Sequence, residues 1–122
     1  MYNKKVLDHF QKPKNMGKLK NPDVVAEVGN MQCGDIMRLY IKVKDDKIKD
    51  ISFETMGCVA AISTSSMITE LAKGKTLAQA SKITFQDVVG ELGELPPVKM
   101  HCADLAVKAL RKAIKKYQGN KD

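Results

Sequence analysis

The chain has 122 residues, of which 43% are hydrophobic and 29% charged, the size and composition of one globular domain with its own core. No apolar run approaches the roughly 20 residues that span a bilayer, and no secretory signal follows Met1, so we expect a cytoplasmic protein. A net charge of +7 would suit an acidic partner, but the absence of Trp and of any RNA-binding signature argues against nucleic acid. These totals predict a single domain, residues 1–122, that binds neither nucleic acid nor a membrane.

The first half of the chain is predicted to form a short helix followed by a small sheet. Helical spacing of Val6, Leu7 and Phe10 predicts an amphipathic helix over residues 2–10, which ends before a loop rich in Pro, Asn and Lys. Apolar and polar residues then alternate in three segments, which predicts strands over residues 24–28, 36–43 and about 50–54. Because short turns join the strands, the sheet is predicted to be antiparallel.

The second half is predicted to be helical and to cover one face of that sheet. A helix over residues 59–73 contains the run Ser63–Ser66, which is poor in helix propensity and suggests either close packing of small side chains or hydroxyls near a functional end. Two capping pairs, Thr76 with Gln79 and Thr84 with Asp87, predict two short helices. The longest helix is predicted to begin at Pro97, and its apolar stripe consists of Cys102, Leu105, Ala106, Ala109, Leu110, Ala113 and Ile114. The expected fold class is α+β, a three-stranded antiparallel sheet covered on one face by helices.

The three cysteines occupy junctions between predicted elements. Cys33 lies in the break between two strands, Cys58 lies where a strand gives way to a helix, and Cys102 lies near a helix start. Their odd number and wide spacing do not form a disulfide framework. Junctions at one end of a sheet can bring ligands together while the scaffold stays intact. We therefore expect the three sulfur atoms to converge on one accessible pocket.

Asp35 and His101 raise the number of candidate donors to five, three thiolates, one carboxylate and one imidazole. This is one donor more than tetrahedral zinc or a [2Fe-2S] cluster requires, which would allow one ligand to exchange. Cys102, beside His101 and the start of a helix, is in an environment that favours a thiolate. Thiolate-rich ligation suits both zinc and iron-sulfur clusters, so the residues alone leave that choice open.

A Cys-His hydrolase is the enzymatic alternative, with Cys102 as nucleophile and His101 or His9 as base. Adjacent residues on a helix point about 100° apart, so His101 is expected to be an awkward base for Cys102. No nucleophile elbow is present in the sequence. We therefore do not expect an enzyme.

The chain resembles the IscU-type (NifU N-terminal-like) iron-sulfur cluster assembly scaffolds over essentially its whole length. The resemblance is carried by the order and spacing of Tyr2–Phe10 with Pro13 and Asn15, Cys33-Gly34-Asp35, Gly57-Cys58, Leu95-Pro96-Pro97-Val98-Lys99 and His101-Cys102. It implies a compact α+β protein that receives sulfur from a cysteine desulfurase, accepts iron from an iron donor, builds a labile cluster and passes it to apo iron-sulfur proteins. Such a protein is a carrier and not an enzyme.

The resemblance also implies roles for particular residues. Cys33, Cys58 and Cys102 would hold the cluster, with Asp35 or His101 as the fourth or exchanging ligand. Cys102 is our choice of persulfide acceptor, because it lies beside His101 near a helix start. The resemblance leaves open whether the cluster is [2Fe-2S] or [4Fe-4S], and whether two chains share it as a homodimer. The segment that an Hsp70-type chaperone system would bind consists of Leu95, Pro96, Pro97, Val98 and Lys99.

Three positions depart from the usual pattern of these scaffolds. Val59 follows the second cysteine where a small residue is usual, Met56 stands where an aromatic residue is common, and Ala103 replaces a frequent Ser. The His101-Cys102 pair is kept, and the insertion that marks the zinc-dependent SufU-type relatives is absent. The sequence therefore favours the IscU branch over the alternative, a zinc-binding sulfur acceptor of SufU type.

Overall fold

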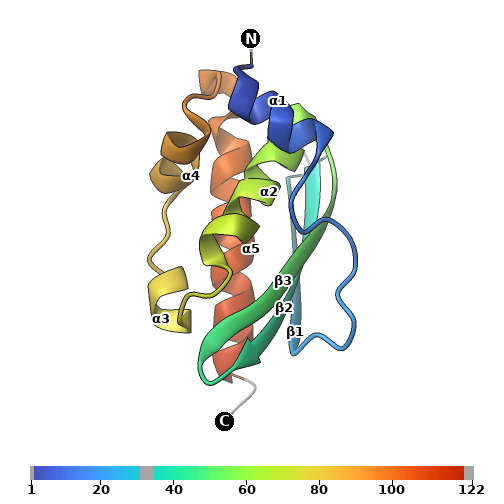
Figure 1. The fold of residues 1–122 in the computed structure, drawn as a ribbon, viewed down its shortest axis with the longest axis vertical. Coiled ribbons are helices and arrows are strands. Elements are labelled where there is room, and N and C mark those ends of the chain that lie inside the picture. Colours follow the sequence, from blue (N-terminus) through green and yellow to red (C-terminus); the bar gives the residue numbers. More distant parts are fainter. Residues whose placement is uncertain (1, 31–34, 120–122) are drawn as a thin grey trace.

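A computed structural model describes residues 2–30 and 35–119, which form a three-stranded antiparallel sheet with helices on one face (Figure 1). This confirms the predicted fold class. In chain order the elements are α1 (Lys4–Gln11), β1 (Val24–Asn30), β2 (Asp35–Lys44), β3 (Lys47–Met56), α2 (Val59–Ala72), α3 (Leu77–Ala80), α4 (Phe85–Leu92), the 3₁₀ turn η1 (Pro97–Lys99) and α5 (Met100–Gly119).

The sheet has the strand order β1-β2-β3, so β1 pairs only with β2 inside it. Asp45 and Asp46, with φ of 54° and 62°, make the left-handed two-residue turn that lets β2 return directly as β3. At the opposite end of the sheet, Asp35 pairs with Asn30 of β1, and its neighbour Ile36 pairs with Met56 of β3. The last residues of β1 and β3 therefore lie side by side with the start of β2.

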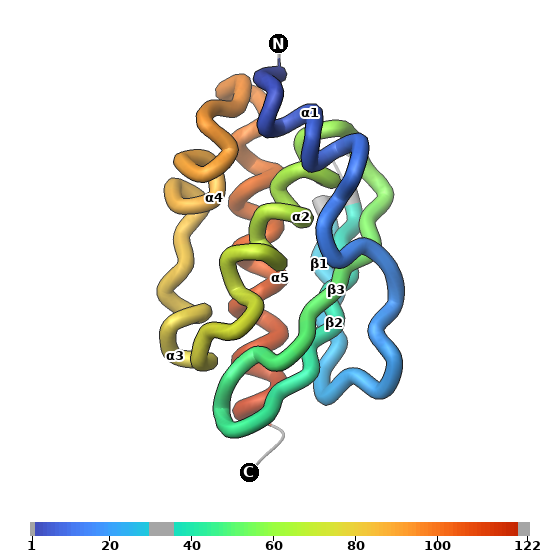
Figure 2. The backbone as a smooth tube through the Cα atoms, viewed as in Figure 1, coloured from blue at the N-terminus to red at the C-terminus, as the bar shows by residue number. Residues whose placement is uncertain are grey.

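The core lies between the sheet and the two helices α2 and α5, which both contact it (Figures 1 and 2). The sheet contributes alternate residues such as Leu39, Ile41 and Phe53, each at most 1% exposed. The buried residues of α5 are Cys102, Ala103, Ala106, Val107, Ala109, Leu110, Ala113 and Ile114. The predicted stripe omitted Ala103 and Val107 and wrongly included the half-buried Leu105, because α5 also contacts α2 and α4 and needs a wider apolar face.

Helix α1 lies across the end of the molecule where α5 begins (Figure 2). The predicted amphipathic helix is present as Lys4–Gln11, in which Val6 is fully buried while Leu7 and Phe10 remain 38% and 37% exposed. The side chain of Asn3 accepts a hydrogen bond from the Val6 N–H and donates one to the Leu92 carbonyl. The helix thus has a proper N-cap that also attaches it to the end of α4.

The hydroxyl-rich run Ser63–Ser66 of α2 is buried, as the close-packing interpretation predicted. Ser63 Oγ donates to the Val6 carbonyl at 2.7 Å, which attaches α1 to α2. Thr64 Oγ1 lies 2.7 Å from the Ala60 carbonyl and 3.3 Å from the Cys102 carbonyl. Small side chains with internal acceptors therefore allow α1 and α5 to approach α2 closely without leaving these hydroxyls unpaired.

The two capping pairs form complete capping boxes at Thr76 and Thr84, as predicted. The longest helix starts slightly differently from the prediction, because Pro97 opens the 3₁₀ turn η1 and the α-helix α5 begins at Met100. Within residues 2–30 and 35–119, no helix combines the length and the apolar character needed to cross a bilayer.

Candidate functional site

Cys58 is the N-cap residue of α2, two residues after the end of β3. Its backbone is extended, with φ of −83° and ψ of −178°, which turns the chain from strand to helix. The residue is half-buried. Its thiol therefore lies at a junction, as predicted, and is not enclosed by the core.

Cys102 is the third residue of α5 and is only 2% exposed. The adjacent His101 ring donates from Nδ1 to the Val98 carbonyl at 3.0 Å, and its Nε2 lies 3.5 Å from Cys102 Sγ. Because a carbonyl can only accept, Nδ1 carries a hydrogen in this contact, and in the neutral imidazole Nε2 is then the acceptor nitrogen facing the sulfur. The sequence argument made His101 an awkward base for Cys102, but the ring, held by the Val98 carbonyl, places Nε2 within 3.5 Å of the sulfur.

Two further residues place both thiols in one electrostatic neighbourhood. The charge that Cys58 carries when ionised is the largest cause of a raised pKa of the Lys99 ammonium, and Cys102 contributes as well. Burial, followed by the charge at Cys58, raises the pKa of the Tyr2 hydroxyl, and Cys102 adds to this. Cys58 and Cys102 therefore act on the same two side chains, although 44 positions of sequence separate them.

The remaining sequence-predicted ligands are only partly described. Cys33 lies in residues 31–34, outside the described residues. The backbone of Asp35 begins β2 beside the end of β1. Gly29 of β1 and His101 of α5 line the same surface groove. The two strands that flank residues 31–34 therefore end beside the helix that carries His101.

Among the described residues, no group of three or more His, Cys, Asp or Glu side chains is placed to hold a metal ion. Cys58, His101 and Cys102 are the predicted donors whose side chains are described. They supply two sulfur atoms and one nitrogen, a soft donor set that suits zinc or iron-sulfur chemistry. The described part of the chain thus provides part of the predicted ligand set and no closed metal site.

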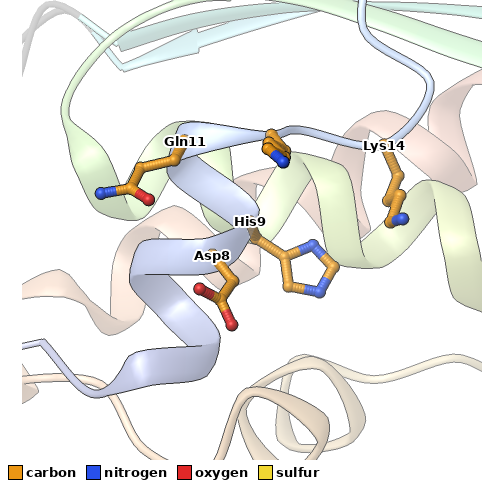
Figure 3. Close-up of a pocket in the computed structure, with 5 residues that line it drawn as sticks. Asp8, His9, Gln11 and Lys14 are labelled. Carbon is orange, nitrogen blue, oxygen red and sulfur yellow. The ribbon is translucent and has the colours of Figure 1, made fainter.

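His9, the second candidate base, lies in a different environment. Its Nδ1 is 2.7 Å from Ser66 Oγ, which also accepts the Lys14 N–H at 2.7 Å, and its Nε2 is 3.6 Å from Glu70 Oε1. Figure 3 shows the ring between Asp8 and Lys14, which line a surface pocket of about 390 Å³ together with His9, Gln11 and Lys12. These contacts attach α1 and the following loop to α2, so His9 has a structural role here.

Sequence reasoning missed both the His9 cluster and the position of Tyr2 and Lys99 beside Cys58. Ser66 and Glu70 are four residues apart in a predicted helix and so lie on the same face of it. This spacing could have indicated that both contact the same side chain. Nothing in the local sequence links Tyr2 or Lys99 to Cys58. That proximity depends on how α1 and η1 pack at this end of the molecule.

The fold and these residues define a class of α+β protein that carries cysteines at junctions near one end of a three-stranded sheet. The family described as "NifU-like N terminal domain" matches residues 1–122. This chain belongs to the NifU-like N-terminal domain family.

Relatives within this group are named as scaffolds. "Iron-sulfur cluster assembly scaffold protein IscU 1" of Archaeoglobus fulgidus is 59% identical over 117 residues, which cover 96% of this chain and 76% of that protein. The IscU scaffold protein of Escherichia coli K12 is 45% identical over 125 residues, covering 99% of this chain and 97% of the relative.

Solved structures agree with the fold. A putative iron-sulfur cluster assembly scaffold protein for the SUF system from Fervidobacterium islandicum has a TM-score of 0.80 at 28% identity, covering 93% of this chain and 96% of the other. The N-terminal part of a NifU-like protein from Brucella abortus has a TM-score of 0.77 at 23% identity, covering 96% and 94%, and supports the fold alone. The IscU proteins share more sequence with this chain than the SUF protein does, which favours the IscU branch over the SufU alternative.

Proposed function

We propose that this chain is a non-enzymatic scaffold on which an iron-sulfur cluster is assembled and from which it is transferred to apo-proteins. The observation that carries the proposal is the shared neighbourhood of Cys58 and Cys102, built from the starts of α2 and α5. Family membership and the names of the relatives support it. Iron, and sulfur from a cysteine desulfurase, are the substrates, and apo iron-sulfur proteins are the recipients.

In this proposal Cys33, Cys58 and Cys102 bind the cluster, and Asp35 or His101 is the fourth ligand. Cluster assembly places negative charge on sulfur, and the Lys99 ammonium beside Cys58 offsets part of that charge. Where Asp35 is the fourth ligand, His101 Nε2, which faces Cys102 Sγ, accepts the proton that leaves the thiol when the sulfur becomes a ligand; where His101 is the ligand, Nε2 binds the cluster instead. Because this end combines an extended N-cap and a 3₁₀ turn, ligands can exchange there without disturbing the sheet.

Cys102 is the proposed acceptor of sulfane sulfur, with His101 as the adjacent base. Since Cys102 is 2% exposed, transfer requires the start of α5 to open, and the half-buried Cys58 is the alternative acceptor. After incubation with a cysteine desulfurase and cysteine, mass spectrometry of peptides is expected to find the extra sulfur atom on Cys102. Sulfane sulfur on Cys33 or Cys58 alone would assign the acceptor role to that residue instead.

Asp35→Ala is expected to lengthen the lifetime of the assembled cluster. A carboxylate is a harder ligand than a thiolate and exchanges more readily, so its removal slows release. The decay of visible absorption after reconstitution measures the lifetime. Asp104→Ala is the matched control, because Asp104 lies near His101 but pairs with Lys108 at 3.0 Å. Decay as fast as in the unmodified protein, or faster, contradicts the exchange role of Asp35.

The segment Leu95–Lys99 is the proposed contact for an Hsp70-type chaperone system. Val98 is 76% exposed and Pro97 is also exposed, whereas Leu95 is 4% exposed and belongs to the core. A partner that binds the folded protein would therefore contact Pro97 and Val98. Contact with Leu95 would require local unfolding of the η1 region.

Anaerobic reconstitution with iron and sulfide tests the proposed function. Visible charge-transfer absorption with bound iron and sulfide is the expected result, and its spectrum separates [2Fe-2S] from [4Fe-4S]. Molar mass with and without cluster shows whether two chains share one. A colourless protein that retains stoichiometric zinc would contradict the proposal and support a zinc-binding sulfur acceptor instead.

A further inference from the structure

Strand β1 forms one edge of the sheet, and two lysines of α5 reach its backbone. Lys112 Nζ donates to the Glu27 carbonyl at 2.9 Å, and Lys116 Nζ donates to the Val25 carbonyl at 2.9 Å. In an edge strand, alternate residues direct both their N–H and C=O groups away from the sheet. Val25 and Glu27 are therefore residues through which β1 could pair with another strand.

The two lysines match the spacing of these carbonyls. Residues four apart on a helix are separated by about 6 Å along its axis, and residues two apart on a strand by about 6.8 Å. The order is antiparallel, since the earlier lysine binds the later carbonyl. The next lysine toward the start of α5, Lys108, pairs with Asp104 instead. The contacts with β1 thus come from two specific positions of α5 within a lysine-rich helix.

We propose that Lys112 and Lys116 close the β1 edge against strand pairing with a second copy of this chain. An antiparallel β1–β1 pair is self-complementary, because Val25 of each copy would face Glu27 of the other across a two-fold axis. To form that pair, each copy would have to remove two ammonium groups from its carbonyls. Four ammonium groups would then lie close together at the axis, which opposes association.

Closure of the β1 edge keeps the neighbouring surface groove accessible. The groove, of about 620 Å³, lies between β1 and α5, and its lining includes Glu27, His101 and Lys112. A second copy paired along β1 would lie over this groove and beside His101. The importance of keeping it open rests on the proposed function, whereas closure of the edge does not.

The test measures self-association of the cluster-free protein, so its outcome is independent of cluster assembly. Lys112→Ala with Lys116→Ala is expected to lower the dimer dissociation constant by at least about tenfold relative to the unmodified protein, as measured by sedimentation equilibrium. Lys108→Ala with Lys115→Ala is the matched control, because it removes the same charge from exposed positions of the same helix. If the control associates as strongly as the test variant, charge alone explains the effect and the proposal is wrong.

A third substitution tests whether β1 forms the contact. Val25→Pro removes an outward N–H that an edge strand does not need for its own sheet. Added to the double variant, it is expected to return the dissociation constant to that of the unmodified protein, whereas Val25→Ala is not. Amide hydrogen exchange should show new protection at Val25 and Glu27 in the double variant alone. Unchanged association of the double variant, or association that Val25→Pro does not reverse, would overturn the proposal.

Discussion

Cys58→Ala and Cys102→Ala are each expected to reduce the yield of cluster in anaerobic reconstitution by at least about tenfold, the lower end of what even outer-shell changes cost at metal sites. Each variant removes a sulfur ligand from the shared neighbourhood formed by the starts of α2 and α5. Alanine is preferred to serine because Cys102 is 2% exposed, and a serine hydroxyl there would need a buried partner. Bound iron per chain and visible absorption measure the yield.

Met56→Ala provides the control for this experiment. Met56 also carries sulfur, lies two residues before Cys58 and is 75% exposed, so its removal changes neither the core nor the proposed ligand set. Its cluster yield should equal that of the unmodified protein. If Cys58→Ala retains a normal yield while Cys102→Ala loses it, Cys58 is not a ligand, and the shared neighbourhood has another role.

Elements defined by local patterns were predicted well. The strand alternation around Leu39 and Phe53 depends only on the two-residue period of a strand with one buried face. The capping boxes at Thr76 and Thr84 each depend on residues three positions apart. In both cases the determining contacts lie within a few residues of sequence, where the pattern can be recognised directly.

Burial that depends on distant elements could not be predicted in this way. Tyr40 lies on the face of β2 opposite Leu39 and Ile41, so alternation predicts an exposed side chain, yet it is 7% exposed and its hydroxyl donates to Glu54 on the neighbouring strand. That hydrogen bond is the main cause of the raised pKa of Tyr40. Leu7 and Leu105 show the opposite difference: both are apolar, yet Leu7 is exposed and Leu105 is only half-buried, because other residues of α1 and α5 face the core. The sequence of a single segment does not show which of its side chains other elements will cover.

The candidate site shows the same division. The position of Cys58 and Cys102 at junctions was evident from the elements on either side of each residue. The contact between His101 and Cys102 was not, because it depends on a ring rotation fixed by the Val98 carbonyl. The proximity of Lys99 to Cys58 depends on tertiary packing across 41 positions of sequence. The sequence thus identified two cysteines that act on the same side chains, and the structure supplied the charged and polar groups around them.

Phe53→Ala is expected to reduce the free energy of unfolding by about 3–5 kcal/mol, the usual cost of removing a buried aromatic ring. Phe53 is fully buried in the core face of β3. Its backbone also fixes the loop after α1, because its N–H donates to the Asn15 carbonyl at 2.9 Å and its carbonyl accepts the Gly17 N–H at 2.7 Å. The cavity left by the missing ring would therefore lie next to β3, which contacts β2, α2 and this loop. Because these neighbours hold the strand in place, they cannot easily move inward to fill the cavity.

Urea unfolding followed by circular dichroism measures the loss, and Phe85→Ala is the matched control. Phe85 is 36% exposed at the first position of α4, so its truncation leaves a smaller cavity and should cost less than about 2 kcal/mol. Equal losses for the two variants would mean that burial of the Phe53 ring is not what stabilises β3. Because β3 leads directly into the Cys58 junction, a larger loss for Phe53→Ala than for Phe85→Ala would show that the core beneath this strand contributes more to the stability of the fold that holds the junction than the surface of α4 does.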